Sequence, residues 1–153
     1  MIFVGIAALI FLLDWHVKKK AEKTLKEDTV REVAGDKILL RRLHNPGVAF
    51  GLLEKKPQIT LWGTAAVITG LLIQFFRELK SGGSRITKLG YALVIGGGLN
   101  NLSDRKRKGY VTDYFSFNVK WERFRNLVFN LSDMFIFLGG LLVCIGNIRK
   151  KNR

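Results

Sequence analysis

Residues 127–148 read LVFNLSDMFIFLGGLLVCIGNI and form the longest apolar run in the chain. A helix needs about 20 predominantly apolar residues to cross a bilayer, and this run meets that length. Asp133 is the only acidic residue within it. An isolated carboxylate in hydrocarbon is costly, so a carboxylate at such a place is a functional-site hypothesis by default. The run therefore predicts a membrane helix with a functional acid near its first end.

Three further apolar runs predict helices over about residues 1–17, 59–76 and 86–102. The third is close to the lower length limit of about 17 residues, but its several glycines suit close helix packing in lipid. The first lacks the basic start and small-residue cleavage site of a secretory signal peptide. The predicted fold class is an all-α membrane protein with four transmembrane helices, in one domain over residues 1–153.

The composition limits the partners. The chain has 26 Lys and Arg against 12 Asp and Glu, a net charge of +14, yet 48% of its residues are hydrophobic. Basic segments beside apolar runs favour membrane lipids with anionic headgroups over nucleic acid. One cysteine and two histidines, Cys144, His16 and His44, exclude an internal disulfide and the usual zinc motifs. We expect neither a metal nor a cofactor, and we expect both histidines to be interfacial polar residues.

The number of spans places the acidic residues. With four spans, the polar segments 18–58 and 103–126 face the same side of the membrane. That side also receives the end of the first helix and the start of the fourth. It therefore holds Asp14, Asp104, Asp113 and Asp133. At 1.5 Å per residue, Asp133 would lie about 9 Å below the start of a helix beginning at 127.

The polar segments carry weaker signals. Lys and Arg are more numerous in 18–58 and 103–126 than in 77–85 and the C-terminal tail, so the positive-inside rule favours a cytoplasmic location. Residues 29–33 and 37–43 predict two short strands around a turn at Gly35-Asp36. The aromatic residues of 114–125 predict an interfacial belt.

Asp113, in GYVTDYFSF, and Asp133, in FNLSDMFIF, form the candidate catalytic pair. Two adjacent carboxylates share one proton, so one can act as a base on water while the other donates to a peptide carbonyl. The residues alone leave alternatives open. Asp133 could cap its helix while Asp113 faces an arginine such as Arg105. The pair could also be the proton relay of a small transporter, or buried ion pairs of a non-enzymatic assembly factor.

Other polar residues near these aspartates are candidate supporting groups. An acid near the end of a helix opposes the helix dipole, so Asp14 needs a partner, and Lys18 is one turn away. Asn130 precedes Asp133 by one turn and suits either a hydrogen bond to a carboxylate or a helix cap. Asn45-Pro46-Gly47 signals a tight turn. Asn101 lies on one helical face with Asp104 and Arg105.

Four motifs together resemble the bacterial lipoprotein signal peptidases, the type II signal peptidase family. They are LLDWHVKK at 12–19, NPGVAFGLL at 45–53, GGGLNNLSDRKRKGYVTDYFSF at 96–117 and FNLSDMFIFLGG at 129–140. The resemblance is collinear over nearly the whole chain. It implies a catalytic pair at Asp113 and Asp133. The supporting positions that it implies are Asp14, Asn45, Gly97, Asn101, Asp104, Arg105 and Asn130.

The resemblance also implies an architecture and a substrate. Family members place four transmembrane helices and a small extracytoplasmic β-cradle in the bacterial cytoplasmic (inner) membrane, with the active site facing outward, contrary to the charge rule. The implied reaction cleaves a diacylglyceryl-modified prolipoprotein just before its lipidated cysteine, and the cyclic peptide globomycin is the expected inhibitor. The chain departs from the family pattern at four positions: Trp15, Gly98, Asn100 and Ser132.

Overall fold

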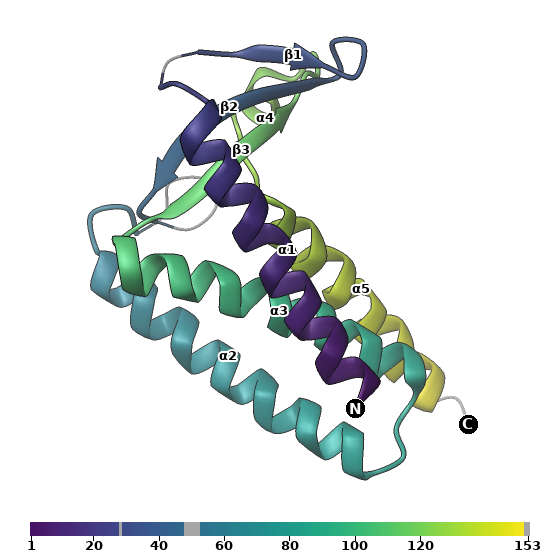
Figure 1. The fold of residues 1–153 in the computed structure, drawn as a ribbon. Helices are drawn as coiled ribbons and strands as arrows, with labels where there is room; N and C mark the ends of the chain where they lie inside the picture. Colours follow the sequence, from purple (N-terminus) through teal and green to yellow (C-terminus); the bar gives the residue numbers. More distant parts are fainter. Residues whose placement is uncertain (28, 48–52, 152–153) are drawn as a thin grey trace.

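The computed structural model describes residues 1–27, 29–47 and 53–151, with the side chains of 150 and 151 excepted. Five helices and three strands follow one another along the chain (Figure 1). In order, they are α1 (Ile2–Thr24), β1 (Arg31–Val33), β2 (Ile38–Asn45), α2 (Pro57–Lys80), α3 (Arg85–Lys108), β3 (Val111–Phe117), α4 (Glu122–Arg125) and α5 (Leu131–Lys151).

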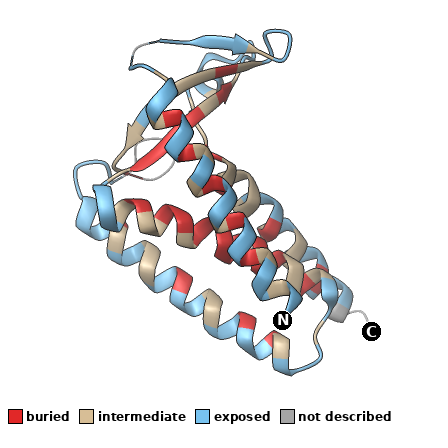
Figure 2. Cartoon of the chain, viewed as in Figure 1, coloured by how far each residue is buried: buried red, intermediate tan, exposed pale blue. Residues whose placement is uncertain are grey.

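Helix α3 is the centre of a helical bundle. It packs against α1, α2 and α5, and it is buried along most of its length (Figure 2). The side chain of Ser84 caps its start by accepting a hydrogen bond from the Ile86 amide, and Gly109 ends it with a left-handed backbone, φ 83°. Glycines permit the close contacts: a Cβ on Gly90 would lie 2.7 Å from the Gly139 carbonyl oxygen of α5.

A three-stranded antiparallel sheet lies at one end of the bundle, and both chain termini lie toward the other end (Figure 1). The strand order is β1-β2-β3. The turn at 34–36, where Ala34, Gly35 and Asp36 all have positive φ, joins β1 to β2. This confirms the predicted hairpin, with strands at 31–33 and 38–45 instead of 29–33 and 37–43.

The third strand was not predicted from the sequence. Residues 114–125 were expected to be an interfacial aromatic belt, but Val111–Phe117 is β3, and it pairs with β2 from Ile38↔Phe117 to Asn45↔Val111. Asp113 is therefore on a strand. Tyr114 is only 6% exposed. The pairing needs β2, some 70 residues earlier, so local pattern could not reveal it.

The helices differ from their predicted bounds. The first and third extend to Thr24 and Lys108 instead of about 17 and 102, because their charged ends keep forming helix beyond the apolar run. The last begins at Leu131 instead of 127, because the preceding Phe129 still bonds to β3 through Phe115. Asp133 consequently lies in the first turn of α5 and not 9 Å below its start.

Two helices among the described residues are long and apolar enough to cross a membrane: α2 and the Leu131–Arg149 portion of α5. Large apolar side chains point outward on three helices, among them Leu9 and Leu12 of α1, Trp62 of α2 and Phe137 of α5. Soluble monomers rarely expose such a surface, and contact with lipid accounts for it. The structure thus supports a mostly helical membrane protein with a small sheet.

Candidate functional site

Asp113 and Asp133 meet at one residue, Asn130. The Asn130 side-chain amide donates to Asp113 Oδ1 at 2.6 Å, and its backbone N–H donates to Asp133 Oδ2 at 3.0 Å. Asp113 comes from β3 and is 2% exposed. Asp133 comes from α5 and is half-buried. The predicted convergence of the two carboxylates, one from a strand and one from a helix, is therefore present.

All four carboxylate oxygens of the pair accept a hydrogen bond. The two not bonded to Asn130 are Asp113 Oδ2, which accepts from Asn45 Nδ2 at 3.0 Å, and Asp133 Oδ1, which accepts from Asn101 Nδ2 at 2.9 Å. The donors are neutral amides, so they fix each carboxylate without placing an opposite charge on it. Two carboxylates held in this way are oriented but not neutralised by an ion pair.

Each of the three asparagines is itself held in one orientation. The side-chain oxygen of Asn45 accepts from the Gly47 amide at 3.0 Å, and that of Asn130 accepts from the Asp133 amide at 3.0 Å. The oxygen of Asn101 accepts from Lys18 Nζ at 2.7 Å. Because each oxygen is occupied by a donor, each amide nitrogen must face the carboxylate. The network thus specifies which way every amide points.

Asn130 realises both of its predicted roles. It donates to Asp113, and together with Asp133 it also forms a reciprocal cap: Asn130 Oδ1 accepts from the Asp133 amide, and Asp133 Oδ2 accepts from the Asn130 amide. The cap sets where α5 begins. The same residue therefore fixes the helix start and joins the two carboxylates.

The surroundings of Asp113 favour its protonated form. Burial, and after it the nearby Asp133 carboxylate, raises the pKa of Asp113 to about 7. The hydrogen bonds from Asn45 and Asn130 oppose this shift, as does the charge of Lys18. A pair in which one carboxyl is protonated and the other ionised near pH 7 can supply an acid and a base at once.

Asp14 lies in the middle of α1 and not near its end, because the helix continues to Thr24. It is fully buried and pairs with Lys18 at 3.3 Å, as the sequence predicted. It also accepts hydrogen bonds from Tyr114 Oη at 2.8 Å and from Ser132 Oγ. Tyr114 follows Asp113 and Ser132 precedes Asp133, so Asp14 ties together the backbones that carry the two aspartates.

Asp104 and Arg105 are neighbours in the sequence but contact different groups. Asp104 pairs with Lys18 and with Lys108, each at 3.1 Å. Arg105 donates to the Gly47 carbonyl at 2.8 Å and so holds the turn that positions Asn45. In the described part of the chain no ion pair joins Arg105 to Asp113, contrary to one of the structural alternatives. Residues 48–52 of the NPGVAFGLL motif lie outside the described residues.

Gly97 lies where α3 contacts the start of α5. A Cβ at this position would lie 2.6 Å from the Ser132 carbonyl oxygen and 3.1 Å from Ile136 Cγ1. We expect Gly97→Ala to push the first turn of α5 away and so to lower both the unfolding temperature and any activity of the site. Overpacking of this kind costs about 1–3 kcal/mol.

Thermal unfolding of the purified protein measures this effect. Gly70→Ala is the matched control, because a Cβ at Gly70 of α2 meets nothing within 4 Å. An alanine there should leave stability unchanged or raise it slightly. If Gly97→Ala unfolded like the wild type, the close contact would not limit this position.

Four residues of the network were not assigned to the site from the sequence: Lys18 (named only as a partner of Asp14), Tyr114, Asn100 and Ser132. Asn100 and Ser132 were noticed only as departures from the family pattern. Asn100 is buried, donates to the Phe11 carbonyl at 2.8 Å and accepts from Lys18 Nζ at 2.7 Å. The one local signal was the four-residue spacing of Asp14 and Lys18. Asn100 adds a hydrogen bond to Lys18, and Ser132 adds one to Asp14.

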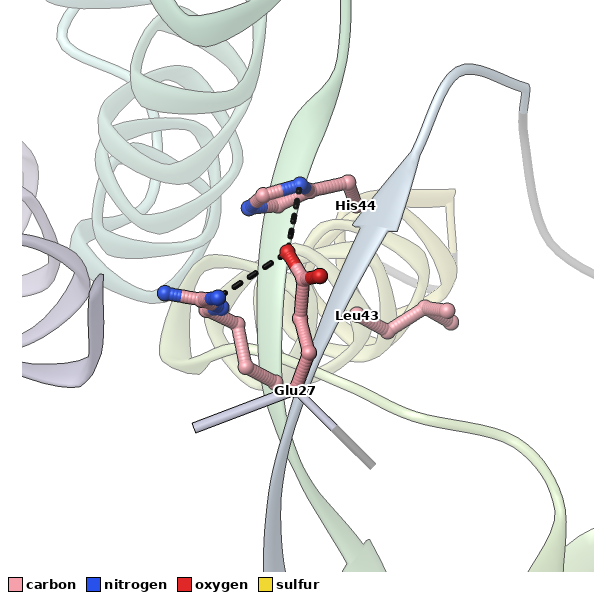
Figure 3. A pocket seen from close by; sticks show the side chains of 4 residues that line it. Glu27, Leu43 and His44 are labelled. Carbon is pink, nitrogen blue, oxygen red and sulfur yellow. Dashed lines mark hydrogen bonds and ion pairs between the residues drawn. The ribbon is translucent and has the colours of Figure 1, made fainter. Parts of the chain in front are cut away.

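A second polar cluster joins β2 to the end of α1, and Lys108 links it to Asp104. His44 stacks on Tyr110 with ring centroids 4.1 Å apart, and its Nε2 lies 3.2 Å from both carboxylate oxygens of Glu22. Glu27 pairs with Arg42 at 2.9 Å and lies 4.0 Å from His44 Nδ1, and with Leu43 these residues line a surface pocket of about 280 Å³ (Figure 3). His44 is thus a partly buried, paired residue, while His16 is exposed on α1.

Comparison with known proteins places the chain in a family. The model of signal peptidase (SPase) II matches residues 6–149. The lipoprotein signal peptidase of Moorella thermoacetica is 33% identical over 94% of this chain and 91% of its own length. That of Halothermothrix orenii is 34% identical over 95% of this chain and 93% of its own length. That of Vibrio parahaemolyticus is 35% identical over 98% of this chain and 89% of its own length.

Solved structures match the fold. A bacterial membrane enzyme solved by the in meso method at 2.3 Å resolution superposes with a TM-score of 0.82 and 22% identity, over 97% of this chain and 88% of that one. A second bacterial membrane enzyme, solved at 1.9 Å, gives a TM-score of 0.76. The arrangement of helices and sheet is therefore one already seen in membrane enzymes.

Proposed function

The chain belongs to the signal peptidase II family, and we propose that Asp113 and Asp133 are its catalytic pair, acting on diacylglyceryl-modified prolipoproteins. The family consists of aspartic-type proteases, and its members remove signal peptides from prolipoproteins. The alternative of a proton-coupled transporter finds no support in the family or in these relatives. The observation that carries the proposal is the junction of both carboxylates at Asn130.

The proposed reaction uses water held between the two carboxylates. The ionised aspartate removes a proton as the water oxygen attacks the carbonyl carbon, and the protonated aspartate donates to the carbonyl oxygen. The C–N bond then breaks as the leaving amine takes up a proton. The raised pKa of Asp113 supports this division, since it leaves Asp113 partly protonated near neutral pH. No covalent intermediate is required.

The supporting residues act by holding this geometry. Asn45, Asn101 and Asn130 each fix one or both aspartates, and Arg105 holds the turn that carries Asn45. Pre-oriented groups contribute because a displacement of about 1 Å can reduce a rate by about 10²-fold. Asp14 and Gly97 set the position of the strand and helix that carry the pair.

We further propose four membrane spans, α1, α2, α3 and α5, in the bacterial cytoplasmic membrane, with the sheet and the aspartates facing outward. The exposed face of α1 supports a boundary between membrane and water near residue 16: Leu9, Leu12 and Leu13 are followed by exposed His16 and by Lys20. A switch from leucine to basic residues along one face is typical of passage from hydrocarbon to headgroups. Membrane lipids are then direct partners of the chain.

One assay tests the function. Purified protein in detergent is incubated with a diacylglyceryl-modified prolipoprotein and, in parallel, with the same precursor lacking the lipid. We expect the mature product only from the modified precursor, with cleavage just before the lipidated cysteine and inhibition by globomycin. Cleavage of both precursors at equal rates would exclude the proposed substrate class, and absence of cleavage by a folded protein would exclude the function.

A further inference from the structure

Lys18 is a buried cation of α1, connected to the candidate catalytic pair through Asn101. It is 2% exposed. Its ammonium group lies 2.7 Å from the side-chain oxygens of both Asn100 and Asn101. Two carboxylates, Asp104 at 3.1 Å and Asp14 at 3.3 Å, complete its surroundings and compensate its charge. A lysine that contacts four oxygens has no freedom to reach a substrate.

The contact with Asn101 gives Lys18 an effect on Asp133. An asparagine amide can present either its oxygen or its nitrogen to a neighbour. Because Lys18 carries only donors, it accepts only the oxygen of Asn101 as a partner, and the nitrogen then faces Asp133 at 2.9 Å. Without Lys18, the oxygen of Asn101 has no fixed partner, and the amide can turn over. Asp133 would then lose its hydrogen-bond donor, because the amide oxygen and the carboxylate repel each other.

Resting on the function proposed above, we infer that Lys18 is a positioning residue of the reaction: it orients Asn101 toward Asp133, and its positive charge stabilises the ionised carboxylate of the pair. Asn100, a departure from the family pattern, takes part by accepting from Lys18 while its own amide donates to the Phe11 carbonyl of α1. It thereby holds Lys18 against α3 on the side of Asn101.

The charged and titratable groups around Lys18 come from four elements. They are Asp14 and Glu22 on α1, Asp104, Arg105 and Lys108 on α3, Asp113 and Tyr114 on β3, and Asp133 on α5. Of the cations among them, Lys108 is neutralised by Asp104 and Glu22. Lys18 is one of the groups that lower the pKa of Asp113, against the larger effects of burial and of Asp133. Its removal should therefore raise that pKa further.

The test measures kcat, KM and the pH profile of Lys18→Met. The wild-type rate should fall as the pH rises above about 7, because the pair then loses its shared proton. In Lys18→Met we expect a kcat about 10²-fold lower with KM unchanged. The alkaline limb should move upward by about one pH unit, the effect of removing a unit charge from a protein interior. Lys18→Arg keeps the charge, so its limb should stay at the wild-type pH.

Lys19→Met is the matched control, because Lys19 is exposed and lies over the Trp15 ring at 4.5 Å, away from the pair. Its kcat and pH profile should equal those of the wild type. A wild-type profile in Lys18→Met, or a lower rate accounted for by the unfolded fraction alone, would overturn the inference. If the folded wild type itself does not cleave the precursor, the proposed function fails, and the inference about Lys18 fails with it.

Lys18→Met leaves Asp14 and Asp104 buried without their cation and can fail to fold. The double variant Lys18→Met with Asp104→Asn removes one of these charges along with the lysine, so its fold is less strained. It should show the loss of kcat at unchanged KM, since Asn101 is still free to turn. A folded double variant with wild-type kcat would equally overturn the inference.

Discussion

Asp113→Asn and Asp133→Asn should each lower the cleavage rate by about 10²–10⁴-fold, the contribution typical of a positioned acid or base. Either change removes one member of the pair, so that water can no longer be deprotonated while the carbonyl is protonated. The fold should survive, because asparagine has nearly the shape of aspartate and neither carboxylate forms an ion pair in the described part of the chain. Product formation from the lipid-modified precursor measures the effect.

Thermal unfolding separates this outcome from a structural role. In the catalytic interpretation activity is lost from a folded protein, whereas in the structural one activity and stability fall together. Asp36→Asn is the matched control: Asp36 is exposed in the turn before β2, and its positive φ is one that asparagine also adopts. Retained cleavage in Asp113→Asn or in Asp133→Asn would remove that residue from the pair.

Asn130→Ala should lower the cleavage rate by about 10²-fold and the stability by about 1 kcal/mol. The rate falls because Asp113 loses its 2.6 Å donor, and stability falls because α5 loses its cap. Asn130→Ser distinguishes the two effects. Serine caps a helix as well as asparagine does, but its short side chain has no amide to reach Asp113. We therefore expect serine to restore the unfolding temperature and not the rate.

Asn118→Ala is the control for this pair of variants. Asn118 is exposed, and its side chain donates to the Asp36 carbonyl of the turn at 2.8 Å, so loss of this side chain should leave the rate unchanged. A rate that recovered in Asn130→Ser together with the stability would mean that Asp113 needs no donor from this position. The role of Asn130 would then be limited to the start of α5.

Much of the site could be predicted because its residues are chemically conspicuous in the sequence. An acid such as Asp133 at the edge of an apolar run is costly, and counting the spans predicted that Asp14, Asp104, Asp113 and Asp133 share one side of the membrane. The structure brings the four together: Lys18 joins Asp14 to Asp104, and Asn130 joins Asp113 to Asp133. The strand at Asp113 could not be predicted in this way, because a strand is defined by its partner, and β2 lies far away in the chain.

By itself, the sequence determined which segments are apolar enough to form helices, where the hairpin turns, and which acids are candidates for a functional site. Those properties depend on hydropathy and backbone preference over a few neighbouring residues. Only the tertiary structure decided that α5 starts at Leu131, that Lys18 is buried among four oxygens, and that three asparagines turn their nitrogens toward the aspartates. Hydrogen bonds are short and directional, and these join residues 68, 82 and 83 positions apart, so no local pattern contains them.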